Sequence, residues 1–151
     1  MSGTIISDPG KPASDWIREI LDKAVREIAE LGVMADELVE ARPVWSVPNK
    51  IMIGQVRVAN EPTTFIWIIC GDLPTDHISS TVASTAREAL RHFSLKWQLD
   101  ASRYDDPATR KAFGLDETQD WSRFTKQLIA KAEELYAMAE DEGLWLQPNG
   151  L

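Results

Sequence analysis

Residues 51–70, IMIGQVRVANEPTTFIWIIC, decide the fold because they contain two apolar segments joined by a turn-forming sequence. Ile51–Val58 alternates apolar with more polar residues, and Thr64–Cys70 is almost wholly apolar and rich in β-branched and aromatic side chains. Both patterns are typical of β-strands. Residues 59–63 between them have the length and composition of a hairpin connection. The segment therefore predicts an antiparallel hairpin whose second strand is covered on both faces.

The residues before the hairpin predict a change from helical to extended backbone. Pro43 and Pro48 favour extended conformations around them, so Val44–Val47 is expected to add a short third strand. Residues 34–41, which begin ahead of the prolines, favour a further helical turn.

An N-terminal helix is predicted between Ser14, a residue type that caps helices, and Gly32, a residue type that ends them. Apolar residues recur between these two positions at helical spacing. They are Ile17, Ile20, Leu21, Ala24, Ile28 and Leu31.

A long central helix is predicted after residues 71–74, GDLP, which break the second strand. Asp76 or Ser79 is expected to cap this helix. Its apolar stripe consists of Ile78, Val82, Ala86, Ala89, Leu90, Phe93 and Trp97. Helical projection places Leu95 and Leu99 away from the stripe, so these leucines are expected either to pack against a further element or to be available to a partner.

The last third of the chain predicts a short helix and then a long one. Asp106-Pro107 suits the start of the short helix, and Gly114 suits its end. Asp116 and Gln119 resemble a capping box for the long helix, which Gly143 is expected to end. The apolar stripe of the long helix consists of Trp121, Phe124, Leu128, Ala132, Leu135, Tyr136 and Ala139.

Together these elements predict an α+β fold, in which a small antiparallel hairpin or three-stranded sheet packs against an N-terminal, a central and a C-terminal helix. The sequence contains neither an internal repeat nor a linker that would separate two cores. One domain is therefore expected at residues 14–146, between a flexible leader at residues 1–13 and a tail at residues 147–151.

The composition favours a cytoplasmic protein that binds neither membranes nor nucleic acid. The sequence contains 16 Lys and Arg against 24 Asp and Glu, a net charge of −8 that opposes binding to polyanions and favours a basic partner. Cys70 is the single cysteine, and it lies in an apolar strand, which excludes a disulfide framework. Neither a signal peptide nor an apolar segment of membrane-spanning length is found in the sequence.

Two strings, GDLPTDH at residues 71–77 and AREALRHFSLKWQ at residues 86–98, are long and specific. Through them the chain resembles a family of small bacterial proteins described only as a domain of unknown function. The resemblance implies one domain of bacterial cytoplasmic origin, and it implies no activity, catalytic residue or cofactor.

One cluster of titratable residues could carry acid–base chemistry or bind an anion, and it centres on the loop from Asp72 to His77. The candidate catalytic residues are Asp72, Asp76, His77, Arg87, Arg91 and His92. Asp72 and Asp76 also suit the ordinary roles of a turn residue and a helix cap. Their spacing is poor for a metal, so no metal and no cofactor is expected.

Aromatic and exposed apolar residues suggest a surface that binds another protein. The candidates are Leu95, Leu99, Trp16, Trp45 and Trp145, the three tryptophans being expected to be partly exposed and Trp145 to fold back on the last helix. The sequence therefore favours a noncatalytic acidic protein-binding module, such as an inhibitor, an adaptor or an immunity-like protein. The alternative is a small enzyme or anion-ligand binder that uses the Asp72–His77 loop.

Overall fold

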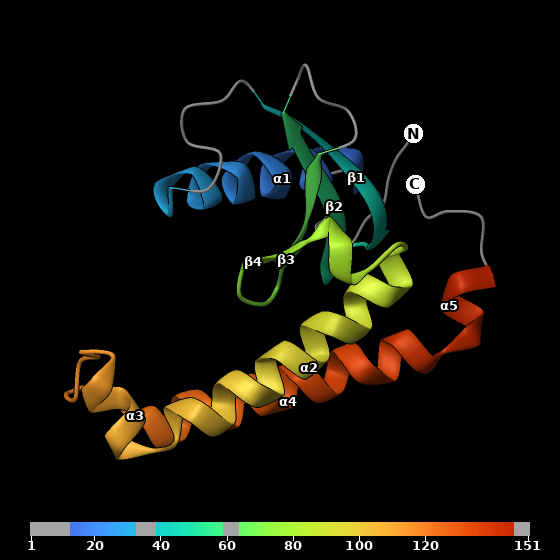
Figure 1. Cartoon of the computed structure of the whole chain (residues 1–151). Coiled ribbons are helices and arrows are strands. Elements are labelled where there is room, and N and C mark those ends of the chain that lie inside the picture. The colour runs from blue at the N-terminus through green and yellow to red at the C-terminus, as the bar shows by residue number, and fades with distance from the viewer. Residues whose placement is uncertain (1–12, 33–38, 59–63, 147–151) are drawn as a thin grey trace. The chain divides into compact units, whose positions relative to one another are not determined.

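The computed structural model describes residues 13–32, 39–58 and 64–146 (Figure 1). The chain divides into two compact units, of which the first comprises Met1–Ala89 with Gln147–Leu151 and the second comprises Leu90–Leu146. In its described residues the first unit combines a helix with a sheet, and the second is helical. The predicted α+β class is confirmed.

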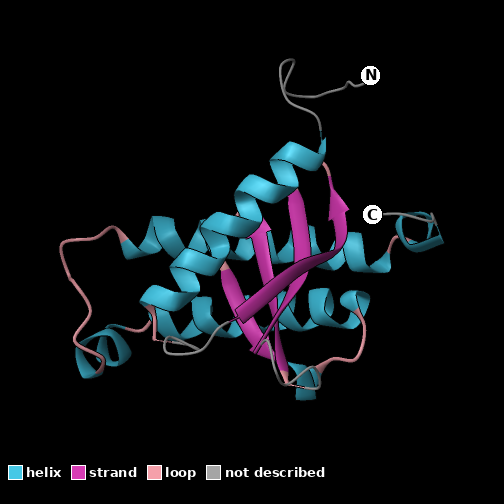
Figure 2. Cartoon of the chain, turned by 90° about the horizontal axis from the view of Figure 1, so that it is seen from above, coloured by secondary structure: helices cyan, strands magenta, loops and turns pink. Residues whose placement is uncertain are grey.

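The sheet of the first unit has four antiparallel strands within the described residues, in the order β1-β2-β3-β4 (Figure 2). The strands are β1 Val39–Val47, β2 Ile51–Val58, β3 Phe65–Gly71 and β4 Asp76–Ser79. The predicted hairpin is confirmed, because β2 pairs with β3 in a register that places Met52 opposite Cys70 and Val56 opposite Ile66. Its connection, residues 59–63, lies outside the described residues.

Strand β1 is longer than the third strand that the prolines predict. Residues 39–41 belong to it and are extended rather than helical, and residues 34–38 lie outside the described part of the chain. The register of β1 against β2 shifts between Pro43 and Trp45, where one additional residue is accommodated in a β-bulge. The strand therefore continues to pair on both sides of Pro43.

The expectation that the central helix begins at Asp76 or Ser79 is wrong, because both residues belong to β4. Ile78 lies opposite Trp67 on β3 and is buried in the sheet rather than on a helix. Pairing with β3 satisfies the backbone of this segment, which overrides the helix start that the cap-forming side chains suggest.

Ser79 does cap a helical turn, but the turn is the short 3₁₀ helix η1, Ser80–Val82. The Ser79 hydroxyl accepts a hydrogen bond from the Thr81 backbone N–H at 3.1 Å. Val82, which was expected in the apolar stripe of the central helix, is 46% exposed.

The central helix, α2, spans Ala86–Tyr104 and begins after Thr85. The Thr85 hydroxyl oxygen accepts from the Glu88 backbone N–H at 3.1 Å. The Glu88 carboxylate in turn accepts from the backbone N–H and the hydroxyl of Ser84, at 2.9 and 2.8 Å. These reciprocal bonds resemble a capping box and fix the start of α2.

Helix α1, Ala13–Glu30, covers one face of the sheet (Figure 2). The helix begins ahead of Ser14, so that residue lies in the first turn instead of capping it. Gly32 follows the helix with a φ of 85°, which is the conformation predicted for a glycine that ends a helix. Leu31 lies beyond the last turn and is 70% exposed, so the stripe expected to include it ends earlier.

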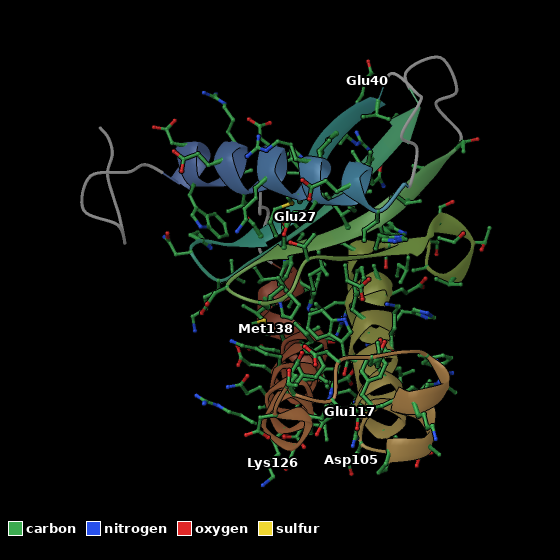
Figure 3. The ribbon with its side chains drawn as sticks, turned by 90° about the vertical axis from the view of Figure 1, so that its left-hand side faces the viewer. Glu27, Glu40, Asp105, Glu117, Lys126 and Met138 are labelled. Carbon is green, nitrogen blue, oxygen red and sulfur yellow. The ribbon has the colours of Figure 1, made fainter. Side chains whose placement is uncertain are left out.

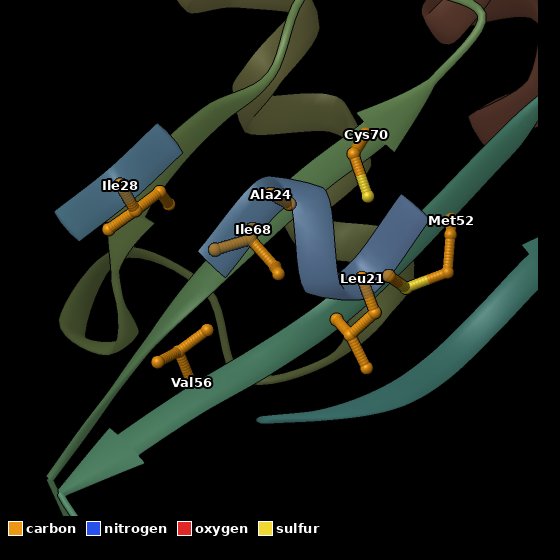
Figure 4. Close-up of a cluster of buried hydrophobic side chains, with 7 residues drawn as sticks. All are labelled: Leu21, Ala24, Ile28, Met52, Val56, Ile68 and Cys70. Atoms are coloured by element: carbon orange, nitrogen blue, oxygen red, sulfur yellow. The ribbon is translucent and has the colours of Figure 1, made fainter. Parts of the chain in front are cut away.

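Polar and apolar contacts both hold α1 on the sheet. The Thr75 hydroxyl donates to the Glu27 carboxylate at 2.8 Å, and Figure 3 shows Glu27 on the side of α1 that faces the sheet. A cluster of buried side chains fills the space between them (Figure 4), and its members are Leu21, Ala24, Ile28, Met52, Val56, Ile68 and Cys70. Burying a large aliphatic side chain contributes about 1.5–3 kcal/mol, so this cluster stabilises the packing of α1 on the sheet.

The second unit contains α2 from Leu90 onward and, beside it, α4, Trp121–Glu140; the two helices run antiparallel to each other (Figure 1). The buried Ser94 hydroxyl on α2 donates to the backbone oxygen of Ala132 on α4 at 2.7 Å. Phe93 and Trp97 are 0% and 2% exposed, which confirms that both are core residues.

The short helix α3, Pro107–Ala112, begins and ends as predicted, with Asp106 as its cap and a φ of 66° at Gly114. The capping box expected at Asp116 and Gln119 is wrong. Asp116 instead accepts from Thr118, and the Asp120 side chain caps α4.

Helix α4 ends at Glu140, and Gly143 lies within a further short helix, α5, Glu142–Leu146. The indole N–H of Trp145 donates to the backbone oxygen of Met138 at 3.0 Å, which confirms that Trp145 folds back on α4. None of the described helices combines the length and the apolar character that crossing a bilayer requires.

Candidate binding groove

The loop predicted as a catalytic candidate does not bring its acidic and imidazole side chains together. Asp76 and His77 are neighbours on β4, opposite Ile69 and Ile68 respectively, so their side chains point to opposite faces of the sheet. The Asp76 carboxylate accepts from the His77 backbone N–H at 2.7 Å. Asp72 is exposed in the bend before β4, and its backbone N–H donates to the backbone oxygen of Lys50 at 2.8 Å.

The remaining catalytic candidates lie on α2. Arg87 is half-buried in its first turn, and His92 is half-buried one turn further along. Arg91 forms an ion pair with Glu140 of α4, with 2.9 Å between Nε and Oε2. Across the described residues, no three His, Cys, Asp or Glu side chains are grouped in a way that could hold a metal ion.

Cys70 is held as a neutral thiol inside the cluster between α1 and the sheet. Burial raises its pKa to about 12, and the negative charge of Glu27 adds to the rise. Because the thiolate is the nucleophilic form of cysteine, this residue is poorly suited to covalent chemistry.

The three tryptophans proposed as partner-binding residues have structural contacts. Trp45 is only 8% exposed, so the expectation that it is partly exposed is wrong: the bulge in β1 turns it into the core. Trp16 is half-buried and packs against the α1 cluster. Trp145 is also half-buried, and its indole N–H is bonded to α4.

The second unit contains a groove between α2 and α4, with a volume of about 400 Å³. Its lining residues on α2 are Arg91, Leu95 and Gln98, and those on α4 are Glu133 and Tyr136. The α2 residues are spaced by four and three positions and the α4 residues by three, so each set lies on one face of its helix. The groove is therefore formed by two helix faces that flank the buried Ser94–Ala132 contact.

Four exposed apolar side chains lie in or beside this groove. Leu95 and Tyr136 line it and are 59% and 56% exposed. Leu99 is one turn from Leu95 on α2 and 58% exposed, and Ile129 is one turn from Glu133 on α4 and 41% exposed. Of the two outcomes expected for Leu95 and Leu99, the structure shows exposure.

The polar groups of the groove are unevenly paired. Arg91 is neutralised by Glu140, and Gln98 donates to the Ser94 hydroxyl at 3.2 Å. Within the described part of the chain, Glu133 and the Tyr136 hydroxyl form neither a hydrogen bond nor an ion pair. The groove therefore offers a free carboxylate and a free hydroxyl next to apolar surface.

The C-terminal part of α4 and helix α5 are rich in carboxylates. Residues 132–146 contain five carboxylates, from Glu133 to Glu142, and no lysine or arginine. The C-terminal end of α4 adds the negative end of a helix dipole to these charges.

Sequence reasoning identified the α2 side of the groove and missed the α4 side. Projection of α2 alone marked Leu95 and Leu99. The sequence pattern places Tyr136 in the core stripe of α4, whereas the structure exposes it. Its exposure depends on how α4 is rotated against α2, which only the packed pair defines.

Comparison with known families shows that the chain belongs to the family described as a domain of unknown function (DUF4826), which matches residues 11–145. No curated protein and no solved structure matches the chain. The family's description carries no activity.

Proposed function

We propose that this member of the family is a noncatalytic protein-binding module of the bacterial cytoplasm, and that it binds a basic partner protein through the groove between α2 and α4. The observation that carries the proposal is the row of exposed apolar side chains along a groove that also contains an unpaired carboxylate. An inhibitor, an adaptor or an immunity-like protein would each work in this way.

The apolar contribution comes from Leu95, Leu99, Ile129 and Tyr136, which are all more than 40% exposed. Contiguous exposed apolar side chains beside a groove mark interaction sites more often than scattered ones do. Tyrosine is also among the residue types most enriched at binding hot spots. Covering these side chains would remove apolar surface from water, which favours association.

The electrostatic contribution comes from Glu133 and from the net charge of −8. A free carboxylate inside an apolar groove loses hydration when a partner covers it, so the partner has to supply a cation at that point. The surrounding negative field attracts a basic surface over a longer range. Both effects select the same kind of partner.

The placement of the predicted catalytic residues supports a noncatalytic role. Asp76 and His77 point to opposite faces of β4, and the Cys70 thiol has a raised pKa. Neither arrangement activates a general base or a nucleophile.

The proposal is tested by affinity capture from a native bacterial lysate with three baits: the unmodified protein, Leu95→Glu and Leu31→Glu. Leu31 is the matched control because it is 70% exposed and lies at the end of α1, in the other unit. We expect one stoichiometric partner on the unmodified protein and on Leu31→Glu, and its loss on Leu95→Glu. The Leu95→Glu substitution should change the free energy of unfolding by no more than about 0.5 kcal/mol relative to the unmodified protein.

Retention of the partner by Leu95→Glu would assign binding to another surface and overturn the proposal. A large loss of stability would place Leu95 in the core, and the exposed Leu99→Glu would then replace it as the bait.

A further inference from the structure

A second surface, in the first unit, gathers four polar side chains on one face of β1 and β2. Glu40 lies opposite Arg57, and Arg42 lies opposite Gln55. Residues two apart on a strand share a face, so the four side chains form a square on the same face. A hollow of about 160 Å³ lies here, lined by Glu40, Ala41, Arg42 and Arg57.

Both arginines of this square turn toward the same neutral oxygen. Arg42 donates from Nε and from an Nη to Gln55 Oε1, each at 3.2 Å, and Arg57 donates from an Nη to the same atom at 2.9 Å. An amide oxygen has two lone pairs, so it is saturated by these donors, while each guanidinium has further N–H groups to donate. Gln55 itself is only 8% exposed, so the oxygen to which both guanidinium groups donate is held in place by the surrounding residues.

The two positive charges are not neutralised by the nearby carboxylate. Cross-strand pairs of opposite charge normally interact, yet Glu40 forms no ion pair within 4.0 Å with any described residue. Figure 3 shows the Glu40 side chain at the end of the sheet, projecting outward from the ribbon. Two guanidinium groups thus converge without a counterion from the described residues.

We propose that Arg42 and Arg57 bind a small carboxylate ligand in this hollow, with Gln55 holding the two guanidinium groups in position. A guanidinium matches the two oxygens of a carboxylate, and two of them can clamp one anion. A water molecule occupies about 30 Å³ in the liquid, so the hollow has room for a carboxylate group and some water. The site is separate from the groove and does not depend on the proposed function.

Glu40 changes how the site discriminates between anions. Its negative charge at the rim repels a doubly charged anion more strongly than a singly charged one. Glu40 therefore reduces the advantage that two positive charges would otherwise give the dianion of phosphate over a singly charged carboxylate.

The experiment is a titration of the full chain with acetate, and separately with inorganic phosphate, at constant ionic strength. Binding is followed through the Nε–H resonances of Arg42 and Arg57 and the side-chain amide resonances of Gln55. We expect saturable shifts with acetate, and the ratio of acetate to phosphate affinity is the reference for the Glu40 variant. Arg42→Ala and Arg57→Ala should each weaken acetate binding at least tenfold, as judged by the remaining resonances. Arg42→Lys should weaken acetate binding less than Arg42→Ala does, because lysine keeps the positive charge and lacks only the paired N–H donors of a guanidinium.

Two control variants complete the test. Arg103→Ala removes an exposed arginine of the other unit and should leave acetate binding unchanged. Glu40→Gln should strengthen phosphate binding more than acetate binding. Shifts that do not saturate, or equal weakening by Arg103→Ala, would overturn the site. An unchanged ratio of acetate to phosphate affinity in Glu40→Gln would overturn the role of Glu40.

Discussion

At the scale of single residues, Cys70 shows how position changes chemistry. The side chain lies between α1 and the sheet, beside Met52 and Ile68, where water cannot solvate a thiolate. Its pKa of about 12 lies above the ordinary value of 9.0, so folding favours the protonated thiol. The thiol therefore stabilises the fold fully below pH 9 and loses this contribution as the pH rises toward 12.

This linkage predicts the pH dependence of stability. The unfolded chain releases the Cys70 proton above pH 9.0, while the folded chain retains it until about pH 12. Between about pH 8 and about pH 10, the free energy of unfolding should therefore fall by about 1.4 kcal/mol more in the unmodified protein than in Cys70→Ala. Urea denaturation of both proteins at each pH measures the difference. Parallel pH profiles would show that the thiol is more exposed to water than the structure indicates.

At the scale of elements, sequence patterns predicted those segments whose partners are close in the chain. The β2–β3 hairpin was recognised because its alternation and its turn are local. Strand β4 was missed because residues 76–79 are short and become a strand only through pairing with β3. The square of polar side chains on β1 and β2 could not be predicted from the sequence either. The register that places Arg42 opposite Gln55 is known only once the two strands are paired.

The corrected start of α2 leads to a prediction about two hydroxyl residues. Thr85→Ala removes the cap of α2 and should lower the free energy of unfolding by about 1 kcal/mol. Ser79→Ala removes the cap of the exposed turn η1 and should change the free energy of unfolding by less than about 0.5 kcal/mol. Thermal or urea unfolding of both variants measures the effects. If Ser79→Ala were the more destabilising change, the helix would begin where its sequence first suggested.

At the scale of the whole molecule, the distribution of charge bears on the proposed binding of a basic partner. The flanking thirds of the sequence carry the excess of carboxylates, with 9 acidic and 5 basic residues in 1–42 and 10 acidic and 6 basic residues in 101–151. The middle, residues 43–100, is balanced with 5 of each. Within the described residues, the excess of carboxylates lies in α1 and in the segments that flank α3 and α4, whereas α3 itself carries two basic residues and no carboxylate.

This excess of negative charge predicts the salt dependence of partner binding. Raising the NaCl concentration from about 0.05 M to about 0.5 M shortens the screening length from over 10 Å to under 5 Å. The association rate with the captured partner should fall at least tenfold, while the dissociation rate, set by apolar contacts in the groove, should change much less. Surface plasmon resonance at several salt concentrations separates the two rates. A salt effect confined to dissociation would contradict attraction by a basic partner.

The bulge at Pro43 has a consequence for how other proteins can contact the sheet. Among the described strands, β1 and β4 each have a neighbour on one side only, so their other sides are where a foreign strand would add. The bulge interrupts the regular run of β1, Pro43 lacks an N–H, and β4 has only four residues. Short or irregular edges are poor templates for backbone pairing. The edges of the described sheet therefore disfavour polymerisation by strand addition. Another protein that contacts this sheet has to do so through its exposed side chains.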